Sequence, residues 1–328
     1  MKILVTGGLG FIGSNFILKL LNHSDNFEII NVDAELYGAN RRNLSDIQNN
    51  EKYEFVKGNI TNKRLMEETI SKCDVVVNFA AESFVDRSIS DANPFLVSNI
   101  RGAFTILDII TKQKKRMVQI STDEVFGSLS SDTATEESKF NPSSPYAATK
   151  AAAELLMNSY YVTHDSDVII TRCTNNYGPR QFPEKLIPKT IILATQKQKI
   201  PIYGKGENIR DWIHVDDHCN GIMSSLLDGK SGQSYNISGN NEINNITIVK
   251  KILDIMGKSE DLIEYVEDRP GHDFRYSMSS NKISKELGWK PKISFEEGIE
   301  KTVEWYLDHE ELWKDLSPKI LDSTPWKN

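Results

Sequence analysis

The chain has 328 residues, a formal net charge of −7 and 39% hydrophobic residues, with three widely spaced cysteines. The odd number of cysteines excludes a simple disulfide framework, and no apolar run approaches the roughly 18 residues of a membrane span. The acidic charge, without a basic stripe, argues against a nucleic-acid partner. We therefore expect a globular protein of the reducing cytoplasm, since the first residues lead into a strand and not into a signal peptide.

Short β-rich runs alternate with helical stretches through the first half of the chain. The strands are predicted at Lys2–Thr6, Glu28–Val32, Tyr53–Lys57, Val75–Phe79, Met117–Ser121 and Val168–Arg172. The helices are predicted at Phe11–Leu21, Asn62–Ser71, Pro94–Lys112 and Pro145–Thr163. Continuous apolar strands indicate a parallel sheet that is covered by helices on both faces. The alternation predicts the α/β class, with a doubly wound and mainly parallel sheet of the Rossmann type.

A glycine-rich turn joins the first predicted strand to the first predicted helix. Gly7, Gly10 and Gly13 have the spacing of a dinucleotide-binding turn, where glycine permits a tight turn and close approach of a pyrophosphate. Asp33 lies 20 residues beyond Gly13, at the end of the second strand. A carboxylate there can hold the ribose hydroxyls of NAD and repel the 2′-phosphate of NADP. The segment therefore predicts NAD as the cofactor.

Candidate catalytic residues follow the fifth strand and open the Ala-rich helix. Tyr146 and Lys150 are four residues apart, so they share one helical face. An ammonium beside a phenol is expected to lower the pKa of the phenol, as suits proton removal during hydride transfer. Asp123 and Glu124 are adjacent at a strand end. From spacing alone they are either a solvated acidic pair or an acid and a base with separated pKa values.

Beyond about Asn175 the pattern is broken by Gly, Pro, Asn and charged residues. This change predicts a division into a cofactor-binding domain at 1–175 and a smaller α/β lobe at 176–328 that mainly binds substrate. One further strand of the large sheet is expected near Gln233–Ile237. The smaller lobe is expected to cap the cleft.

The basic side chains and histidines of the segment 176–328 can be interpreted in two ways. Arg180, Arg210, Arg269 and His272 are either surface charges or a diphosphate clamp, a natural role for arginine. His214 and His218 are four residues apart, but a third ligand and the glutamate of a zinc-protease motif are missing. No metal site is expected.

At this point the sequence resembles the extended short-chain dehydrogenase/reductase family, and within it the dTDP-glucose 4,6-dehydratases. The discriminating motif is Ser-Thr-Asp-Glu-Val-Phe-Gly at 121–127, because the family's epimerases and decarboxylases generally lack the Asp-Glu pair. The resemblance covers nearly the whole chain. The matching segments are Thr6–Ser14, Asn78–Ile89, Ser121–Gly127, Ser144–Glu154, Arg172–Pro188, Tyr203–His218 and Asp268–Tyr276.

The resemblance implies a lyase with an internal redox cycle, in which tightly held NAD is regenerated in each turnover. Tyr146, helped by Lys150 and Thr122, would take the proton of the glucose C4 hydroxyl while NAD accepts hydride. Glu124 would then remove the C5 proton, and Asp123 would protonate the C6 hydroxyl so that water leaves. Hydride return to C6 gives dTDP-4-keto-6-deoxyglucose, a precursor in deoxysugar biosynthesis such as that of rhamnose.

The resemblance also assigns binding residues and a partner. Besides Tyr146 and Lys150, the residues implied for NAD are Gly7, Gly10, Phe11, Ile12, Gly13, Asp33, Asn59, Ile60, Ala80, Ala81 and Asn99. Those implied for the nucleotide sugar are Ser83, Thr122, Asn175, Glu184, Lys185, Arg210, Asn245, Arg269, His272 and Tyr276. By analogy with the family, the helices at 94–112 and 145–163 would pair in a homodimer.

Three positions depart from the family pattern. Asn59 replaces an aspartate expected to contact adenine, and its amide can still donate and accept hydrogen bonds. Phe84 replaces a histidine and Phe126 replaces a tyrosine, both of which are expected near the sugar. Each phenylalanine would remove a polar contact, with a consequence for sugar selectivity that the sequence does not define.

Two other functions are compatible with parts of the pattern. A UDP-sugar 4-epimerase or decarboxylase would share the cofactor motifs but would leave the Asp123–Glu124 pair unexplained. A non-catalytic regulator that binds NAD and nucleotide would have no need of Tyr146, Lys150 and Thr122. Thymine and uracil present the same hydrogen-bonding edge, so the sequence does not decide between them.

Overall fold

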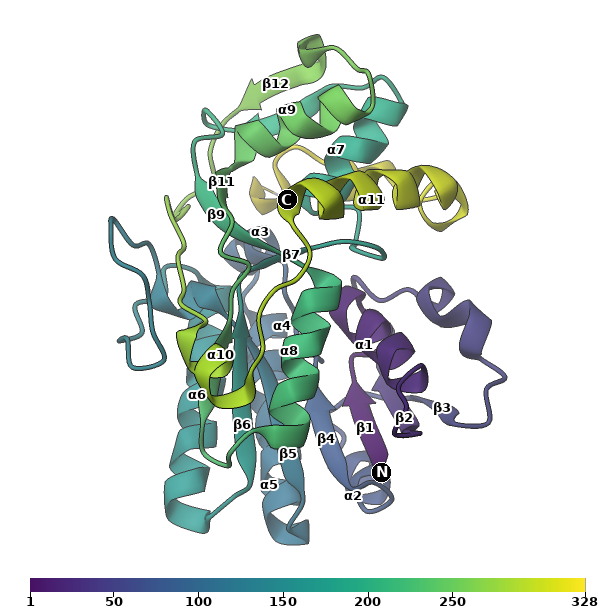
Figure 1. Cartoon of the computed structure of the whole chain (residues 1–328), viewed down its shortest axis with the longest axis vertical. Coiled ribbons are helices and arrows are strands. Elements are labelled where there is room, and N and C mark those ends of the chain that lie inside the picture. Colours follow the sequence, from purple (N-terminus) through teal and green to yellow (C-terminus); the bar gives the residue numbers. More distant parts are fainter. Residues whose placement is uncertain (328) are drawn as a thin grey trace.

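The computed structural model describes residues 1–327, and its larger lobe is built on one seven-stranded sheet (Figure 1). Every strand pair in this sheet is parallel, and the order is β10-β6-β5-β4-β1-β2-β3. The strands are β1 (Lys2–Thr6), β2 (Glu28–Asp33), β3 (Tyr53–Lys57), β4 (Val75–Asn78), β5 (Arg116–Thr122), β6 (Val168–Cys173) and β10 (Ser234–Ile237). The order reverses at β1, and a ligand crevice forms at such a point, beyond the carboxyl ends of the strands.

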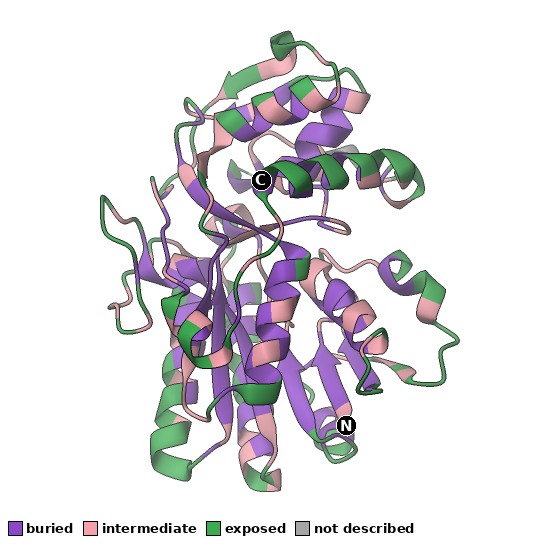
Figure 2. Ribbon diagram, in the orientation of Figure 1, coloured by how far each residue is buried: buried purple, intermediate pink, exposed green. Residues whose placement is uncertain are grey.

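Helices cover both faces of this sheet, as the apolar strands predicted. Successive residues of β1 point to opposite faces, so Ile3 and Val5 join one core cluster while Leu4 joins another. The first cluster includes α1 (Phe11–Leu21) and α8 (Val215–Asp228); the second includes α2 (Lys63–Ile70), α5 (Ala103–Gln113) and α6 (Pro145–His164). Figure 2 shows the sheet as almost wholly buried between these layers. The fold class predicted from the sequence is thereby confirmed.

The smaller lobe stands beyond the carboxyl edge of the large sheet (Figure 1). It has two small sheets, in the orders β11-β9-β7 and β12-β8. Its strands are β7 (Asn175–Tyr177), β8 (Ile200–Tyr203), β9 (Ile209–His214), β11 (Glu242–Asn244) and β12 (Ile263–Val266). Its helices are α7 (Leu186–Thr195), α9 (Asn245–Ile255) and α11 (Phe295–Asp308). Tyr177, Trp212 and Ile299 lie in their common core.

The chain returns from the smaller lobe to the larger one. α8 and β10 follow β9, and α10 (Asn281–Leu287) packs on both of them. β10 pairs with β6 near the position expected at Gln233–Ile237. Ile222, Tyr235 and Ile283 belong to the same core as β1. A division of the chain at residue 175 therefore separates the lobes only in part.

The predicted helix at 94–112 is wrong in its interior. The structure has α4 (Asn93–Phe95), a π-helical segment at Leu96–Gly102, and then α5. Within the wider turn, the Asn99 side chain is buried and bonded to the backbone of Glu82 on the preceding loop. Such turns are common near functional sites. The helix α3 (Val85–Ser90) was not predicted.

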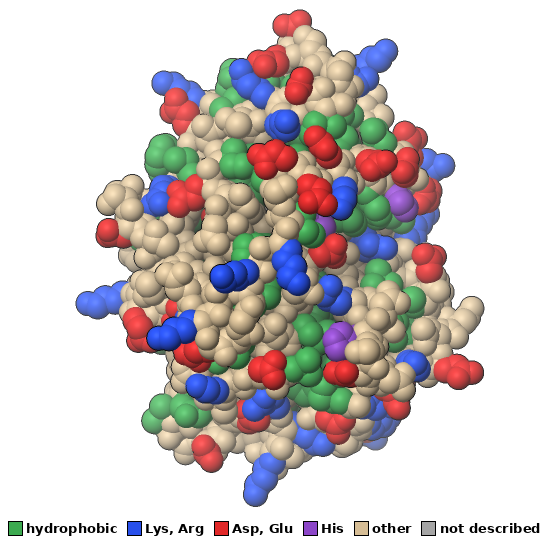
Figure 3. Space-filling view, viewed as in Figure 1, with side chains coloured by type: hydrophobic (Ala, Val, Ile, Leu, Met, Phe, Trp, Pro, Cys, Tyr) green, Lys and Arg blue, Asp and Glu red, His purple; other side chains and the backbone are tan. Residues whose placement is uncertain are grey.

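Short 3-10 segments complete the described elements. They are η1 (Arg41–Ile47), η3 (Asp123–Phe126), η4 (Glu260–Leu262), η5 (Glu310–Leu312), η6 (Pro318–Leu321) and η7 (Pro325–Lys327). No helix within residues 1–327 has the length and apolar character needed to cross a membrane. On the face shown in Figure 3, basic and acidic side chains are interspersed over both lobes, without a stripe of one sign.

A buried ion pair fastens α6 to the sheet. Arg172 of β6 donates from Nη2 to Glu154 Oε2 of α6 at 2.7 Å, and from Nε at 2.9 Å. Both side chains are almost fully buried. Ser121 of β5 donates to the same carboxylate. The helix that carries Tyr146 and Lys150 is therefore held to the two strands whose ends enter the crevice.

We predict that Glu154→Gln lowers the free energy of unfolding by about 3–5 kcal/mol, because Arg172 would keep a buried charge without its partner. Removal of both charges in E154Q/R172M should recover much of this loss. Urea unfolding of both variants, followed by circular dichroism, measures the two differences.

Glu297→Gln is the matched control for this comparison. It breaks an exposed pair with Lys301 on α11 and should leave the unfolding midpoint close to that of the wild type. If Glu154→Gln shifted the midpoint no more than this control does, the buried pair would not hold the helix as described.

Candidate active site

A cleft of about 290 Å³ opens at the carboxyl ends of β1, β2, β4, β5 and β6, under the smaller lobe. Its walls contain most of the residues that the sequence assigned to NAD and to catalysis. These wall residues are Gly7, Gly10, Phe11, Ile12, Gly13, Asp33, Asn59, Ile60, Ala80, Ala81, Thr122, Asp123, Glu124, Tyr146 and Lys150. Besides Thr122, three of the residues assigned to the sugar nucleotide also line it: Ser83, Asn175 and Lys185.

The glycine turn shapes one end of the cleft. Gly7 has φ +72°, and a β-carbon there would lie 2.6 Å from the backbone nitrogen of Ala80. A β-carbon at Gly13 would lie 2.5 Å from the Gly7 carbonyl oxygen. Both positions therefore exclude a side chain. The turn brings the N-terminus of α1, with its partial positive charge, to the wall of the cleft, where a pyrophosphate could bind.

Backbone N–H groups of residues close by fix two of the side chains assigned to NAD, Asp33 and Asn59. Asp33 accepts hydrogen bonds from the backbone nitrogens of Leu9 at 3.0 Å and Glu35 at 2.8 Å, which fix its carboxylate at the cleft wall. Asn59 Oδ1 accepts from the backbone nitrogen of Thr61 at 2.9 Å, so this oxygen caps its own turn.

Asn99, which the resemblance assigns to NAD, is not among the residues that line the cleft. It is buried behind the loop that follows β4, where its amide binds the Glu82 backbone and donates to Thr149 Oγ1 at 3.0 Å. The π-helical turn places it there. Asn99 supports the cleft wall from behind.

Tyr146 and Lys150 lie one turn apart at the start of α6. Lys150 Nζ donates to the Ile120 carbonyl oxygen at 2.6 Å, and burial lowers the pKa of Lys150 to about 8. The negative charge of Glu154, one turn further along α6, raises that pKa and favours the ammonium form. The lysine is therefore fixed beside the end of β5.

The expected lowering of the Tyr146 pKa is wrong for the site as it stands. Burial raises the pKa of the phenol well above its usual value, and the charge of Glu124 raises it further. Contact with Thr122 lowers it by less. The sequence pattern placed the lysine correctly along the helix, but it did not show that a neighbouring carboxylate faces the same phenol.

Asp123 and Glu124 occupy different electrostatic environments. Burial raises the pKa of Asp123 well above its usual value, and Glu124 and Asp211 raise it further. The pKa of Glu124 is also raised by burial, but less strongly, because Arg269 and the other cations that face it act against the rise. Of the two, Asp123 therefore holds its proton more strongly, and Glu124 is more readily ionised.

Both carboxyl groups have an oxygen free for a ligand. Asp123 Oδ2 and Glu124 Oε2 are buried without a hydrogen-bond partner among the described residues. Thr122 caps the short helix η3 by accepting from the Glu124 backbone nitrogen at 3.3 Å, and it donates to Asp123 Oδ1 at 3.2 Å. The solvated acidic pair that spacing alone allowed is excluded by this burial.

Two of the basic side chains expected to hold a diphosphate, Arg210 and Arg269, belong to the smaller lobe and act on Glu124, but they are not among the residues that line the cleft. Arg269 is buried, and its Nε has no partner among residues 1–327. Arg210 donates to the carbonyl oxygen of Asp273 at 2.8 Å, and its guanidinium lies 4.2 Å from the centroid of the Tyr276 ring. Both arginines act electrostatically on Glu124. Arg210 is thus buried and the side chain of Arg269 is only 14% exposed, so neither is a surface charge.

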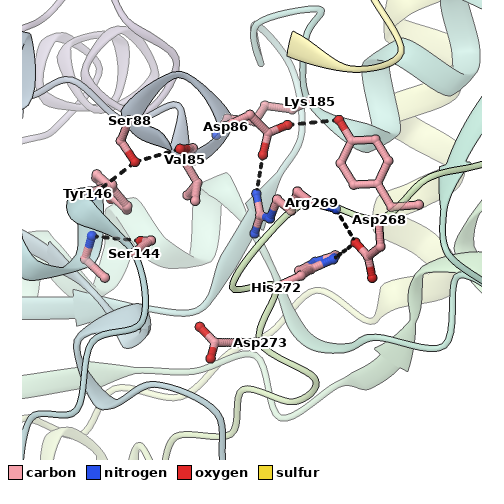
Figure 4. Close-up of polar contacts among 12 residues, drawn as sticks. Val85, Asp86, Ser88, Ser144, Tyr146, Lys185, Asp268, Arg269, His272 and Asp273 are labelled. Carbon is pink, nitrogen blue, oxygen red and sulfur yellow. Dashed lines mark hydrogen bonds and ion pairs between the residues drawn. The ribbon is translucent and has the colours of Figure 1, made fainter. Parts of the chain in front are cut away.

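The other residues assigned to the nucleotide are spread around this group. His272 binds Asp268 through Nδ1 at 2.6 Å (Figure 4). Glu184 is paired with Arg87 and accepts a hydrogen bond from Tyr37. Asn245 opens α9 at the edge of the smaller lobe. None of the three is among the residues that line the cleft.

Arg180 and the two neighbouring histidines have other roles. Arg180 donates to the Asn43 carbonyl oxygen at 3.2 Å, so it joins η1 to the smaller lobe. His214 caps α8, where its Nδ1 accepts from the Asp216 backbone nitrogen at 3.2 Å. His218 is buried, with its Nδ1 2.8 Å from Asn176 Oδ1. Within residues 1–327, no group of three potential metal ligands is present.

The two phenylalanine departures lie in different places. Phe84 lines the cleft, where its ring packs edge-on against Tyr37 and Phe182 at centroid distances of 4.9 and 5.5 Å. Phe126 is instead buried in a core cluster with Val125 and Phe140. The expectation that Phe126 lies near the sugar is therefore wrong, because η3 turns this side chain to the interior.

Sequence reasoning missed several residues of the cleft. Tyr37, Phe182 and Asn176 line it, although none belongs to a periodic pattern. Asn176 adjoins a predicted residue, and the Tyr37 and Phe182 rings meet 5.0 Å apart only because two distant loops converge. No sequence signal specified that convergence.

The fold and the site define an extended short-chain dehydrogenase/reductase: a Rossmann sheet, a glycine turn, a Thr-Tyr-Lys set and a second lobe over the cleft. A family model for GDP-mannose 4,6 dehydratase matches residues 4–302. A dTDP-glucose 4,6-dehydratase of Streptomyces niveus is 43% identical over 99% of this chain and 98% of its own. The chain belongs to the family of dTDP-glucose 4,6-dehydratases.

Two further relatives support this placement. The low-salt glycan biosynthesis protein Agl12 of Haloferax volcanii is 47% identical, over 95% of this chain and 100% of its own. The crystal structure of dTDP-glucose 4,6-dehydratase from Bacillus anthracis in complex with NAD has 46% identity and a TM-score of 0.91. That comparison covers 97% of this chain and all of the other.

We predict that Lys150→Met stabilises the protein most at neutral pH. An unfolded lysine has its pKa near 10.5, whereas burial lowers the pKa of Lys150 to about 8, so the cost of burying its charge is full below pH 8. Above pH 8 the folded wild type releases the proton and regains stability. The advantage of the variant should therefore shrink by about 2 kcal/mol between about pH 7.5 and about pH 9.5.

Urea unfolding at the two pH values measures this change, with Lys52→Met, at an exposed lysine, as the control. The control should show no comparable dependence on pH. A constant difference between Lys150→Met and the wild type would show that Lys150 is not a buried cation.

Proposed function

We propose that this protein is an NAD-dependent hydro-lyase that converts dTDP-glucose to dTDP-4-keto-6-deoxyglucose and water. The observation that carries this proposal is the unequal pair at the end of β5. Asp123 is held protonated by burial and by its neighbours, while cations favour the ionised form of Glu124. Elimination of water needs such an acid and base together, whereas a 4-epimerase does not need this pair.

The residues of the cleft divide the work of the reaction. NAD, when bound, would supply the hydride acceptor and donor, and its positive charge would favour the Tyr146 phenolate. Tyr146 Oη takes the proton of the C4 hydroxyl, and Lys150 stabilises the charge that develops there. The carboxylate of Glu124 removes the proton at C5, which the C4 ketone has acidified. The carboxyl group of Asp123 then gives its proton to the C6 hydroxyl, and water leaves. The hydride taken from C4 would return to C6 and a proton to C5, which gives the 4-keto-6-deoxy product and would leave the cofactor as NAD.

The first part of the chain, 1–175, is proposed to bind NAD and the second, 176–328, mainly the nucleotide sugar. Asp33 at the end of β2 suits the ribose hydroxyls, and the glycine turn suits the pyrophosphate. The orphan Nε of buried Arg269 suits a diphosphate oxygen, for which a guanidinium is a strong donor.

The other site residues are assigned with them. For NAD these are Phe11, Ile12, Asn59, Ile60, Ala80 and Ala81. For the nucleotide sugar they are Ser83, Thr122, Asn175, Glu184, Lys185, Arg210, Asn245, His272 and Tyr276. Asn99 is assigned an indirect role, behind the wall of the cleft.

The two rival functions fit less well. A UDP-sugar 4-epimerase or decarboxylase would give the buried pair Asp123 and Glu124 no role in its reaction. A non-catalytic binder of NAD and nucleotide leaves the buried Tyr146 and Lys150 unexplained, since burying a lysine costs stability. The free thiols of Cys73, Cys173 and Cys219 are in keeping with a reducing cytoplasm.

The test is incubation of purified protein with dTDP-glucose and, in parallel, with UDP-glucose, each with and without added NAD. Mass spectrometry should show loss of one water, and proton NMR a new C6 methyl signal. The ratio of the two rates identifies the preferred base. A C4 epimer of unchanged mass would instead establish an epimerase, and bound NAD without turnover would support the regulator.

We predict that Glu124→Gln lowers the dehydration rate by about 100-fold or more, because the C5 proton loses its base. Enzyme-bound NADH should accumulate, since C4 oxidation still proceeds, and its absorbance measures that accumulation. Glu137→Gln, at an exposed glutamate of the following loop, is the matched control and should retain wild-type activity. Dehydration by Glu124→Gln at the wild-type rate would assign the base to another group.

The protein is further proposed to be a homodimer through α5 and α6. Leu96, Phe104, Leu155 and Val162 on or beside these helices are large apolar residues with 39–79% of their surface exposed. Phe104 also contacts Tyr160, at a centroid distance of 5.9 Å, so the two helices share one face. Large exposed apolar side chains gathered on two packed helices are typical of an interface.

We predict that Leu155→Glu shifts the protein from dimer to monomer in analytical ultracentrifugation, because a charge would be buried in the apolar contact. Tyr265→Ser, at an exposed residue of β12, is the control and should leave the mass unchanged. A wild type that sediments as a monomer would refute the interface, as would a dimeric Leu155→Glu.

A further inference from the structure

The short helix α3 lies between two segments: the loop of the smaller lobe that carries Arg269 and His272, and the start of α6, which carries Tyr146 (Figure 4). It follows the loop after β4 and belongs to the larger lobe. Its residue Asp86 faces Arg269 of the smaller lobe, and Ser88, two residues on, faces the start of α6. The mechanism above gives neither Asp86 nor Ser88 a role.

Asp86 joins two segments of the smaller lobe. Its Oδ1 accepts from Arg269 Nη1 at 2.5 Å, and its Oδ2 accepts from the hydroxyl of Tyr203 at 2.9 Å. The side chains of Asp86 and Arg269 are only 12% and 14% exposed. One carboxylate thus satisfies an arginine and a tyrosine from different parts of the chain.

This contact uses only part of the arginine. The Nε of Arg269 has no partner among the described residues, although it is buried. Asp86 therefore occupies one amino group of the guanidinium and leaves another donor for a ligand. The loop is held independently by Asp268, which accepts from the Arg269 backbone nitrogen at 2.8 Å and binds His272.

The other side of α3 touches the catalytic helix. Ser88 Oγ accepts from the Tyr146 backbone nitrogen at 3.2 Å and donates to the Val85 carbonyl oxygen at 2.6 Å. The same short helix thus contacts both the proposed diphosphate anchor and the residue proposed as the base for the C4 hydroxyl.

Arg269 faces two carboxyl groups, and its charge acts on both. Charged and titratable groups from several elements face Glu124: the cations Arg269, Lys185 and Arg210, the acids Asp123 and Asp273, the phenols of Tyr146 and Tyr276, and the thiol of Cys173. Those that face Asp86 are Arg269, Tyr203, Lys185 and Lys189. Without Asp86, the charge of Arg269 would act on Glu124 without its counter-ion.

We propose that Asp86 is a positioning residue that orients Arg269 toward the nucleotide diphosphate. As the counter-ion of Arg269, it also limits how strongly the arginine's charge acts on Glu124, the proposed base. The inference rests on the proposed function, because it takes Arg269 as the diphosphate anchor. It adds a link between substrate binding and catalysis, in which α3 holds both at fixed positions.

The test is Asp86→Asn, which keeps the shape and removes the charge. We expect the KM for dTDP-glucose and the Kd for dTDP, by calorimetry, to rise about tenfold, since a charge-assisted contact that fixes the arginine is lost. The acidic limb of the kcat profile should move to lower pH, because an uncompensated Arg269 stabilises ionised Glu124. A merely structural role would not move that limb.

Asp167→Asn is the matched control. It removes the charge of an ion pair with Arg116 at the opposite end of the sheet, and it should leave KM, Kd and the pH profile unchanged. Should Asp86→Asn fail to fold, Asp86→Glu replaces it. That variant keeps the charge and misplaces it, so KM should rise while the acidic limb stays at its wild-type pH.

The outcomes separate the two proposals. A wild type that turns over no sugar nucleotide refutes the proposed function. A wild type that is active, with Asp86→Asn binding dTDP equally or more tightly, refutes the role of Asp86 alone. An unchanged acidic limb in folded Asp86→Asn would likewise overturn the claim that Asp86 protects Glu124.

Discussion

The cleft depends on taking two adjacent carboxyl groups out of water at the end of β5. In water both would be ionised near neutral pH, and neither could donate a proton. Burial raises the pKa of both Asp123 and Glu124, but the cations of the smaller lobe, chiefly Arg269, act against that rise at Glu124. The difference between an acid and a base is therefore created by the neighbours of the two residues.

The positions of these two carboxyl groups depend on rigid packing of β5, β6 and α6. The parallel register of β5 and β6 places Ser121 beside Arg172, and both reach the same buried carboxylate on α6. That carboxylate, Glu154, also supports the ammonium form of Lys150 from within the helix. Glu154 thus both holds α6 against the sheet and favours the charged form of Lys150.

The smaller lobe does more than cover the cleft. It supplies the charges that separate the two carboxyl groups, and it returns to the large sheet through α8 and β10. Arg269 bridges back to the larger lobe through Asp86 on α3. Under the proposed function, the contacts that bind the nucleotide are also those that prepare the acid and the base, so remote binding energy can serve the chemical step.

Much of the fold and part of the site follow from local chemistry in the sequence. The glycine turn has steric requirements that only glycine meets at Gly7, and apolar runs with a period of two or 3.6 define strands and helices. The carboxyl ends of parallel strands share one edge, so the sequence by itself determined that Asp33, Asp123 and Tyr146 would lie near one cleft.

Only the tertiary structure decided what surrounds those residues. Phe126 faces the core, Asn99 lies behind the wall, and Arg269 meets Asp86 although 183 positions separate them. The pKa of Tyr146 is raised by burial and, further, by the charge of Glu124. Burial and charge depend on distances in space between segments that are remote along the chain, and periodicity in a sequence carries no record of those distances.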